Sequence, residues 1–384
     1  MNKILQGDCI EQLRTLPDGI VQTCITSPPY YGLRDYGTGT WEGGNPDCPH
    51  VRVSKKSDKT ITGHKNFDDM NGVGDAIQKS ICNYCGAVRV DKQIGLEETP
   101  DKYIQRLVEV FREVKRVMKD DGTVWLNLGD SYWGGKGQSG SRDAEYQELR
   151  NLSGKSINAK HQQMGGKGKT RPTDRKHNII KPKDLIGIPW RVAFALQADG
   201  WYLRQDIIWH KPNPMPESVT DRCTKSHEYI FLLTKSAKYW YDHEAIKENS
   251  TSNDTRPSAL KRSRAFGYNT KDKKIKGYKD NPNEIRRFDV SEGTRNKRSV
   301  WTVNTKPYKE AHFAVFPDDL IKPCVLAGCP KGGIVYDPFG GSGTTAEVAI
   351  RAGRKWILSE LNPEYVDIAN TRLRPHMLQR CLAL

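Results

Sequence analysis

The sequence has no hydrophobic run long enough to cross a membrane, because no stretch approaches about 18 uninterrupted apolar residues. The opening segment MNKILQGDC also lacks the apolar core of a secretory signal. Acidic residues are outnumbered, with 46 Asp and Glu against 61 Lys and Arg and a formal net charge of +15. We therefore expect an intracellular protein without a membrane partner, whose nine cysteines are mostly reduced. The basic excess favours a polyanion such as nucleic acid as its partner.

The lysine of a triphosphate-binding loop is also missing. Residues 335–350, VYDPFGGSGTTAEVAI, place a Gly-rich turn between an expected strand and an expected helix. The run Gly-Thr-Thr stands where a phosphate-binding loop has Gly-Lys-Ser/Thr, and the glycine spacing does not fit the dinucleotide fingerprint. Glu360 follows at the end of the next expected strand, where a carboxylate suits two ribose hydroxyls. This pattern favours a ligand with a ribose but no polyphosphate, such as S-adenosylmethionine, over an ordinary turn with a surface glutamate.

Helix and strand patterns alternate along much of the chain, which is typical of α/β proteins. Apolar residues recur at helical spacing within 9–19, 99–122 and 184–200, and the intervening segments 20–26, 123–130, 201–212 and 227–236 are short and β-branched. The last two segments suit an antiparallel pair. Three polar stretches, 37–95, 134–181 and 241–298, interrupt the alternation. They divide the chain into a catalytic domain (1–36, 96–240 and 299–384) and three insertions.

The stretch TSPPYYGLRDYG, residues 26–37, directly follows an apolar strand pattern. Prolines remove backbone donors and stiffen the chain, so Pro28 and Pro29 can end the strand and leave a carbonyl free. A tyrosine held by such a turn offers a flat ring on which another ring can stack.

These two motifs together resemble those of DNA amino-methyltransferases, and their order, with the catalytic motif first, resembles the β class of that family. The resemblance implies a class I methyltransferase-like fold, a mostly parallel seven-stranded sheet with helices on both faces and one antiparallel strand. It also implies methyl transfer from S-adenosylmethionine to an exocyclic nitrogen of a base flipped out of duplex DNA. The resemblance makes Ser27, Pro28, Pro29 and Tyr30 the catalytic residues.

The other site residues follow from the same resemblance. The cofactor would be bound by Asp8, Cys9, Phe316, Asp337, Pro338, Phe339, Gly340, Gly341, Ser342, Gly343, Thr344, Thr345, Glu360 and Asn362. The pocket for the target base would include Tyr31, Trp209, Lys211 and Asn213. An alternative equally compatible with the sequence is that Trp209 is a core residue and Lys211 a solvated one, with no role in the pocket.

The chemistry needs acceptors for the amine protons, because the amine lone pair is delocalised into the ring. The Ser27 hydroxyl and the Pro28 carbonyl can serve, and Tyr30 would stack on the base. Family members with Ser before Pro-Pro-Tyr mostly methylate cytosine N4, so we expect cytosine N4, with adenine N6 as the alternative. Methylation at cytosine C5 would need a Pro-Cys thiolate, but Cys324 lies in an apolar helical pattern typical of a packed cysteine.

Four spaced metal-type ligands occur in the first insertion, as the pairs Cys48-x-His50 and Cys82-x-x-Cys85. Two close pairs of nitrogen and sulfur ligands match a structural tetrahedral zinc site. His64 can substitute for His50, and a disulfide is the weaker alternative in a reducing compartment. We expect structural zinc within residues 37–95.

The segment 241–298 lies where the β class carries its target-recognition region, and 134–181 reads as a basic flexible loop. We expect DNA contacts from seven basic residues: Lys261, Arg262, Arg264, Lys271, Lys273, Lys274 and Lys276. The alternative for this segment is a solvated linker. Partners expected from the resemblance are double-stranded DNA, a second copy in a homodimer and a cognate restriction endonuclease, in a bacterial or phage-infected cytoplasm. Two further readings are a zinc-containing DNA-binding protein without transfer activity and a methyltransferase acting on RNA or a small molecule.

Overall fold

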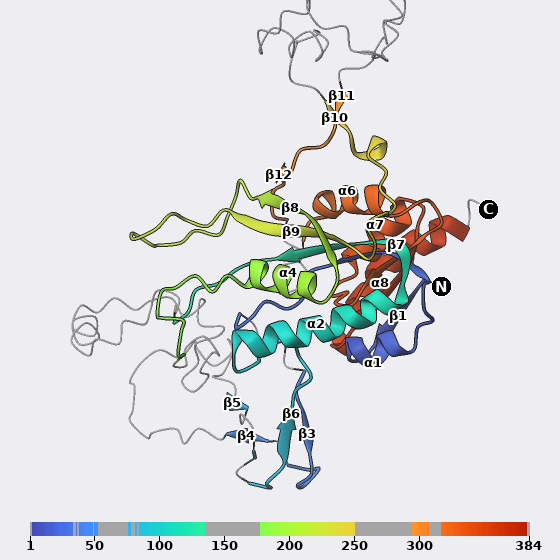
Figure 1. Ribbon diagram of the computed structural model, residues 1–384. Coiled ribbons are helices and arrows are strands. Elements are labelled where there is room, and N and C mark those ends of the chain that lie inside the picture. Colours follow the sequence, from blue (N-terminus) through green and yellow to red (C-terminus); the bar gives the residue numbers. More distant parts are fainter. Residues whose placement is uncertain are drawn as a thin grey trace, which may run out of the picture. The chain divides into compact units, whose positions relative to one another are not determined.

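Figure 1 shows the computed structural model, which describes residues 2–33, 36, 38–48, 50–52, 76–77, 81–82, 84–134, 177–249, 294–306 and 316–381. The chain forms two units, Met1–Tyr241 with Ser299–Leu384 and, separately, Asp242–Arg298. The second unit starts one residue after the start of the expected target-recognition region, whose function stays a prediction. Its seven predicted DNA-contacting residues lie outside the described residues, as does 135–176 of the expected flexible loop.

A single large sheet forms the centre of the first unit, and within the described residues it has eight strands in the order β1-β14-β13-β2-β7-β9-β8-β12. These strands are β1 (Lys3–Gln6), β2 (Val21–Thr26), β7 (Met118–Leu128), β8 (Tyr202–His210), β9 (His227–Thr234), β12 (Val300–Thr302), β13 (Ile334–Asp337) and β14 (Lys355–Glu360). Among them, only β9 runs antiparallel to its neighbours. The expected mixed sheet and the antiparallel β8–β9 pair are confirmed. The expected count of seven strands is wrong, because the three-residue β12 adds an edge strand beside β8.

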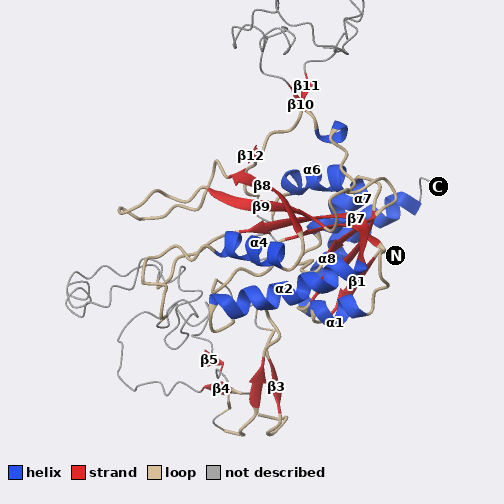
Figure 2. Ribbon diagram, in the orientation of Figure 1, coloured by secondary structure: helices blue, strands red, loops and turns tan. Residues whose placement is uncertain are grey.

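Helices cover both faces of this sheet (Figure 2). One layer contains α1 (Cys9–Arg14), α2 (Pro100–Val117) and α4 (Ile188–Ala198). The other contains α6 (Asp318–Gly328), α7 (Thr344–Arg351) and α8 (Pro363–Cys381). The layering follows from the sequence, because the central strands are hydrophobic on both sides and must be covered on both. The strand β2, for example, is buried at every residue.

The helix α2 shows how the sequence sets an element's limits. Thr99 caps its first turn by accepting a 3.2 Å hydrogen bond from the Lys102 amide, and Pro100 occupies the first helical position. The helix ends at Val117, five residues before the expected end at Gly122, because Met118 already begins β7 opposite Val21. The glycine that suggested a helix end lies within β7 instead.

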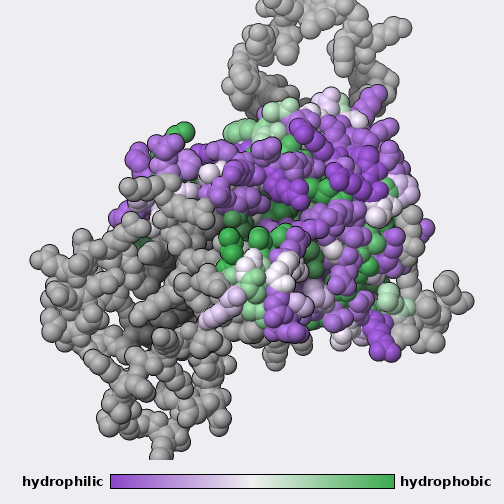
Figure 3. All heavy atoms as spheres, turned by 90° about the horizontal axis from the view of Figure 1, so that it is seen from below, coloured by the Kyte–Doolittle hydropathy of each residue, from purple (hydrophilic) through white to green (hydrophobic). Residues whose placement is uncertain are grey.

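Short strands outside the main sheet belong to two insertions. In the first insertion β3 (Thr40–Glu42) pairs antiparallel with β6 (Val88–Val90), and β4 (Val51–Arg52) pairs with β5 (Ala76–Ile77). In the second unit the 3₁₀ helix η3 (Glu244–Ile246) precedes the antiparallel pair of β10 (Glu248–Asn249) and β11 (Thr294–Arg295). None of the helices that the structure describes is long and apolar enough to cross a membrane. In Figure 3 hydrophilic side chains cover most of the described surface seen from below, with hydrophobic ones showing between them.

Candidate active site and metal cluster

A cavity of about 760 Å³ opens where the parallel strands of the main sheet end. The two sequence motifs that lie some 310 residues apart both line it: Ser27–Tyr30 follows β2, and Asp337–Ser342 follows β13. These two strands are neighbours in the sheet, paired in parallel at Tyr336 and Cys24. Parallel neighbours present their carboxyl ends at the same edge, which is why the two turns meet.

The turn after β2 is held from behind by a buried hydroxyl. Tyr103 in α2 donates a 2.9 Å hydrogen bond to the carbonyl oxygen of Pro29. Gly95 lies close as well, since a Cβ added there would be 3.1 Å from the Tyr30 carbonyl oxygen. This contact and the positive φ of 102° require glycine. The turn is therefore a rigid support for the side chains it presents to the cavity.

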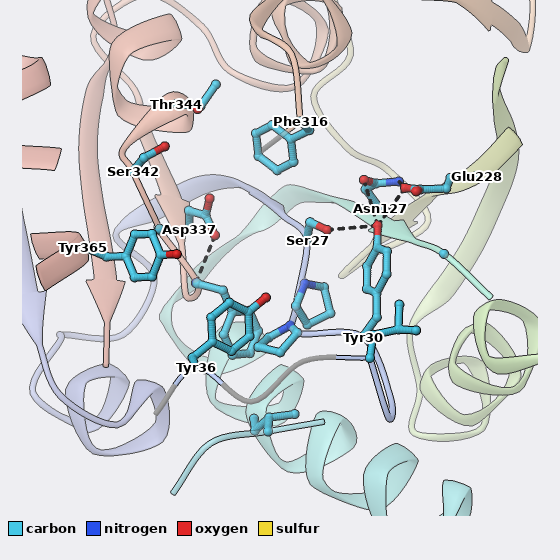
Figure 4. Close-up of a pocket in the computed structure, with 18 of the residues that line it drawn as sticks. Ser27, Tyr30, Tyr36, Asn127, Glu228, Phe316, Asp337, Ser342, Thr344 and Tyr365 are labelled. Carbon is cyan, nitrogen blue, oxygen red and sulfur yellow. Dashed lines mark hydrogen bonds between the residues drawn. The ribbon is translucent and has the colours of Figure 1, made fainter. Parts of the chain in front are cut away.

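Three polar side chains meet at the Tyr30 hydroxyl (Figure 4). It donates its one proton to Glu228 Oε2 at 2.7 Å, lies 3.3 Å from Asn127 Oδ1, and accepts from Ser27 Oγ at 3.2 Å. Burial, and then the charge of Glu228, raises the pKa of Tyr30 well above its usual 10. Tyr30 therefore remains a neutral hydrogen-bond donor, and its ring is fixed at its outer end.

A buried ion pair completes this side of the cavity. Lys211 pairs with Glu228, and the two side chains are only 17% and 15% exposed. The Lys211 ammonium also lies 4.2 Å from the centre of the Trp209 ring, and the indole of Trp209 donates to the Val303 carbonyl at 2.8 Å. Trp209 and Lys211 both line the cavity.

Two residues expected in the base pocket lie elsewhere. Tyr31 is 1% exposed and packs in the core against Tyr103, with ring centres 5.5 Å apart. Asn213 exchanges two hydrogen bonds with the backbone of Thr305, at 3.0 and 3.3 Å, outside the cavity wall. Tyr31 therefore supports the core, and Asn213 ties together two loops.

The glycine turn at the other end of the cavity is organised by Asp337. Its carboxylate accepts hydrogen bonds from Thr26 Oγ1 at 2.6 Å, Thr345 Oγ1 at 2.7 Å and the Phe339 amide at 3.0 Å. Burial raises the pKa of Asp337 from 3.8 to about 6. Because Thr26 directly precedes Ser27, the buried carboxylate connects the glycine turn to the Ser27–Tyr30 turn.

The turn itself packs too tightly for side chains. A Cβ on Gly340 would lie 2.8 Å from Leu358 Cβ, and Gly343 has a φ of 85° at the start of α7. Glu360, at the end of β14, accepts hydrogen bonds from the amides of Gly341 and Asn362, each at 2.8 Å. Burial raises the pKa of Glu360 above its usual 4.5.

Most of the predicted cofactor residues share this end of the cavity. Those on its wall are Asp8, Cys9, Phe316, Asp337, Pro338, Phe339, Gly340, Gly341, Ser342, Thr344, Glu360 and Asn362. Gly343 and Thr345 lie behind the wall, where Thr345 supports Asp337. Asp8 caps α1 through the amides of Ile10 and Glu11, at 3.0 and 3.1 Å.

The four predicted metal ligands converge in the first insertion. The ligand atoms of Cys48, His50, Cys82 and Cys85 all lie within 4.8 Å of one another, with Cys48 Sγ and Cys82 Sγ 3.7 Å apart. The buried Nε2 of His50 has no hydrogen-bond partner among the described residues. A buried nitrogen without a partner is costly unless it binds something, so this donor set fits a tetrahedral metal ion. His64, the alternative ligand, lies outside the described residues.

Two polar residues that line the cavity beside Tyr30, Asn127 and Glu228, were not predicted from the sequence. Asn127 is the next-to-last residue of β7, so its place near a strand end was a usable signal. Glu228 is the second residue of β9 and had no such signal. Cys324, considered for C5 methylation, is 1% exposed inside α6 and outside the cavity wall.

Comparisons with known proteins agree with this arrangement. The chain is 40% identical over 371 residues to the type II methyltransferase M.Cfr9I of Citrobacter freundii, covering 97% of this chain and 87% of that protein. It is 38% identical to the type II methyltransferase M.SmaI of Serratia marcescens, covering 97% and 90%. Its fold resembles that of PvuII DNA methyltransferase (cytosine-N4-specific), with a TM-score of 0.52 at 15% identity, covering 97% of this chain and 86% of that one.

The sequence pattern of one family spans most of the chain. The N6/N4 methyltransferase family, described as DNA methylase, matches residues 21–371. This span includes both the Ser27–Tyr30 turn and the glycine turn after β13, which line the cavity. The chain belongs to the N6/N4 DNA methylase family.

Proposed function

We propose that this protein is the modification enzyme of a type II restriction-modification system and transfers a methyl group from S-adenosylmethionine to N4 of a cytosine flipped out of duplex DNA. The observation that carries the proposal is the shared cavity of the Ser27–Tyr30 turn and the glycine turn after β13. One end suits a base and the other a nucleoside. Methyl transfer needs the two ligands side by side, because proximity and in-line alignment supply much of the rate.

Ser27 is oriented as an acceptor by its neighbours. The Lys211 ammonium fixes the Glu228 carboxylate, Glu228 accepts the Tyr30 proton, and Tyr30 in turn accepts the Ser27 proton. The lone pairs of Ser27 Oγ are then left for the protons of the base amine. Together with the Pro28 carbonyl, they draw the amine nitrogen out of conjugation, and its lone pair becomes nucleophilic.

When bound, S-adenosylmethionine supplies an electrophilic methyl group on a positively charged sulfur. N4 of cytosine forms the new bond to carbon as the carbon–sulfur bond breaks, with the electron pair staying on sulfur, and N4 then releases a proton to solvent. In this proposal the Tyr30 ring stacks on the base. Asp337 organises the glycine turn, and Glu360 with Asn362 faces the ribose.

Lys211 favours cytosine over adenine. It places a cationic donor on the wall of the base pocket, next to Glu228 and Tyr30. The pairing edge of cytosine carries the O2 acceptor on the far side of N3 from the amine, whereas adenine has a C–H group at the corresponding position. A donor that reaches this position would therefore have a partner on cytosine alone. The cytosine-N4 specificity of the PvuII enzyme, whose fold this chain resembles, points the same way.

Zinc fits the remaining cluster as a structural ion. Cys48, His50, Cys82 and Cys85 would hold it, and the ion would fix the described part of the insertion, where only five residue pairs join its short strands. The Asp242–Arg298 unit would carry target recognition, with the phosphate contacts expected from the basic residues of 261–276. A homodimer and a cognate endonuclease belong to the same proposal.

The direct test is to incubate the protein with labelled S-adenosylmethionine and duplex DNA of verified motif diversity, and to identify the labelled nucleoside by mass spectrometry. N4-methylcytosine is the expected product. N6-methyladenine would keep the reaction and overturn the inference from Ser27 and Lys211. Label in RNA alone would overturn the DNA substrate.

A pair of variants separates binding from chemistry. Ser27→Ala should abolish transfer and retain cofactor affinity, because Ser27 faces the amine and not the nucleoside. Asp337→Asn should weaken cofactor binding, because it disturbs the glycine turn. Loss of cofactor affinity in Ser27→Ala would contradict this division of roles.

A further inference from the structure

We propose that the metal-binding insertion forms the rim of the cofactor end of the cavity, so that metal binding and cofactor binding strengthen each other. The inference rests on the proposed function for the identity of the ligand at that end. Its basis is a continuous set of contacts from the metal cluster to Tyr36 and Asn362.

The described part of the insertion has little to hold it together besides the cluster. Three residue pairs join β3 to β6, and two join β4 to β5. A two-stranded ribbon of this size is at best marginally stable in water. The cluster is attached directly to the ribbon: His50 stacks on Trp41 of β3, with ring centres 4.6 Å apart, and the Cys82 amide donates to the Ala87 carbonyl at 2.7 Å.

Asp91 joins the two ends of the insertion just beyond this ribbon. Its Oδ1 accepts hydrogen bonds from Thr38 Oγ1 at 2.9 Å and from the Gln93 amide at 3.0 Å. Its Oδ2 pairs with Arg89 of β6 at 3.0 Å, and these two side chains are only 14% and 16% exposed. The Asp91 carboxylate thus connects Thr38, near the start of the insertion, to Gln93, near its end, and to Arg89 in the ribbon.

Both ends of the insertion form part of the cavity wall, through Thr38 and Gln93. Tyr36, which lies just before the insertion, also lines the cavity, and its amide donates to Gln93 Oε1 at 2.7 Å. The Tyr36 carbonyl accepts from Asn362 Nδ2 at 3.5 Å, next to Glu360.

A ring contact reinforces this junction. The rings of Tyr36 and Tyr365 meet edge to face at 6.4 Å, and both side chains border the cofactor end in Figure 4. Tyr36, together with Thr38 and Gln93 of the insertion, therefore forms one side of the place where the nucleoside would bind.

Coupling follows from this shared structure. Whichever ligand binds first orders the residues around Asp91 and Tyr36, and the second ligand then has less ordering left to impose. Linkage requires that the factor by which metal tightens cofactor binding equals the factor by which cofactor tightens metal binding. Couplings of this kind are on the order of 5–150-fold, and we expect about tenfold here because the contact involves one face of the cavity.

The experiment measures both halves of the linkage on the full-length protein. Titration calorimetry with S-adenosylhomocysteine, the product form of the cofactor, compares zinc-loaded protein with protein stripped by a chelator. Zinc affinity is then measured by competition with a chromophoric chelator, with and without saturating S-adenosylhomocysteine. The expected result is about tenfold weaker nucleoside binding without zinc and about tenfold weaker zinc binding without nucleoside.

Variants at the junction keep the test valid if stripping the metal unfolds the protein. Asp91→Ala retains all four ligands and should bind zinc while losing most of the coupling. Asp91→Asn retains an acceptor for Thr38 and Gln93 and should lose less. Glu42→Ala removes an exposed carboxylate from the same ribbon and should retain the full coupling.

Two results would overturn the inference in different ways. S-adenosylhomocysteine affinity that is the same with and without zinc would overturn the coupling alone. No binding of S-adenosylhomocysteine by the zinc-loaded protein would overturn the proposed function and this inference together.

Discussion

The hydroxyl of Tyr30 donates a 2.7 Å hydrogen bond to the carboxylate of Glu228, which lies 198 residues further along the chain. A tyrosine that only stacked on a base would not need its outer end fixed. The hydrogen bond to Glu228 restricts the orientation of the Tyr30 ring. Because Lys211 holds Glu228, Glu228 accepts the Tyr30 proton, and the Tyr30 oxygen accepts the Ser27 proton. Several measurable consequences follow from this and from the neighbouring contacts.

Glu228→Ala should lower kcat about 100-fold, the loss expected when a reacting group is misplaced by about 1 Å. The change frees the Tyr30 ring and leaves the Lys211 ammonium buried without its partner. Cofactor affinity, measured by calorimetry, should remain unchanged, because Glu228 lies at the opposite end of the cavity.

Tyr30→Phe tests whether the two residues act together. It keeps the ring and loses the hydroxyl, so the double variant with Glu228→Ala should be little worse than Glu228→Ala alone. Glu98→Ala is the matched control, since it breaks an exposed ion pair with Lys102 at 2.6 Å and should leave kcat unchanged. Effects on kcat that simply multiply would show that Tyr30 and Glu228 act independently.

Gly129→Ala should impair transfer by moving the Tyr30 ring. A Cβ at this position would lie 2.6 Å from Tyr30 Cε2, closer than real Cβ contacts allow. We expect turnover to fall by about 100-fold. Gly122→Ala, whose Cβ would lie 3.0 Å from the Gln22 carbonyl oxygen, is the control, because it should cost stability and preserve turnover per folded molecule. Equal turnover losses in both variants would show a general folding defect.

Asp337→Asn should change how stability depends on pH. Because the pKa of Asp337 rises to about 6 in the folded protein, its stabilising contribution is fully present below about pH 4 and is lost as the pH rises through 6. Relative to the wild type, the asparagine variant should therefore gain about 3 kcal/mol between pH 4 and pH 7.5. Urea unfolding at pH 4, 6 and 7.5 measures this, and a difference that does not vary with pH would contradict it.

Tyr103→Phe should loosen the Ser27–Tyr30 turn from behind. The variant removes the 2.9 Å hydrogen bond to the Pro29 carbonyl and leaves that buried oxygen without this donor. We expect a loss of about 1–3 kcal/mol of stability and a fall in kcat of several-fold, with cofactor affinity retained. Denaturant unfolding and single-turnover rates on one preparation measure the two effects. A stability loss with unchanged kcat would show that the turn is held by its prolines alone.

Local patterns in the sequence predicted much of the fold. The apolar spacing of α2, the glycine turn before α7 and the prolines after β2 are each set by residues close together in the chain, which is why they were recognised. The end of α2 was misplaced because Gly122 is typical of a helix end. In the folded protein this glycine instead allows β7 to pack closely on the neighbouring strand.

Long-range contacts account for what the sequence left open. Tyr30 and Tyr31 are adjacent and chemically alike, yet one faces the cavity and the other is buried in the core. Nothing in their sequence context says which way each side chain points. Asn127 and Glu228 likewise acquire their place only when β7 pairs with β9.

The antiparallel direction of β9 has a consequence for how the enzyme can diversify. A strand that runs against its neighbours presents its first residues where the others present their last, so Glu228 reaches the cavity from the start of β9. Its position is set by ladder pairing with Trp209 and by the ion pair with Lys211, the first residue after β8. The rest of the connection, residues 212–226, can therefore change in length without moving the carboxylate, so sequence variation at the cavity mouth is compatible with a fixed Glu228.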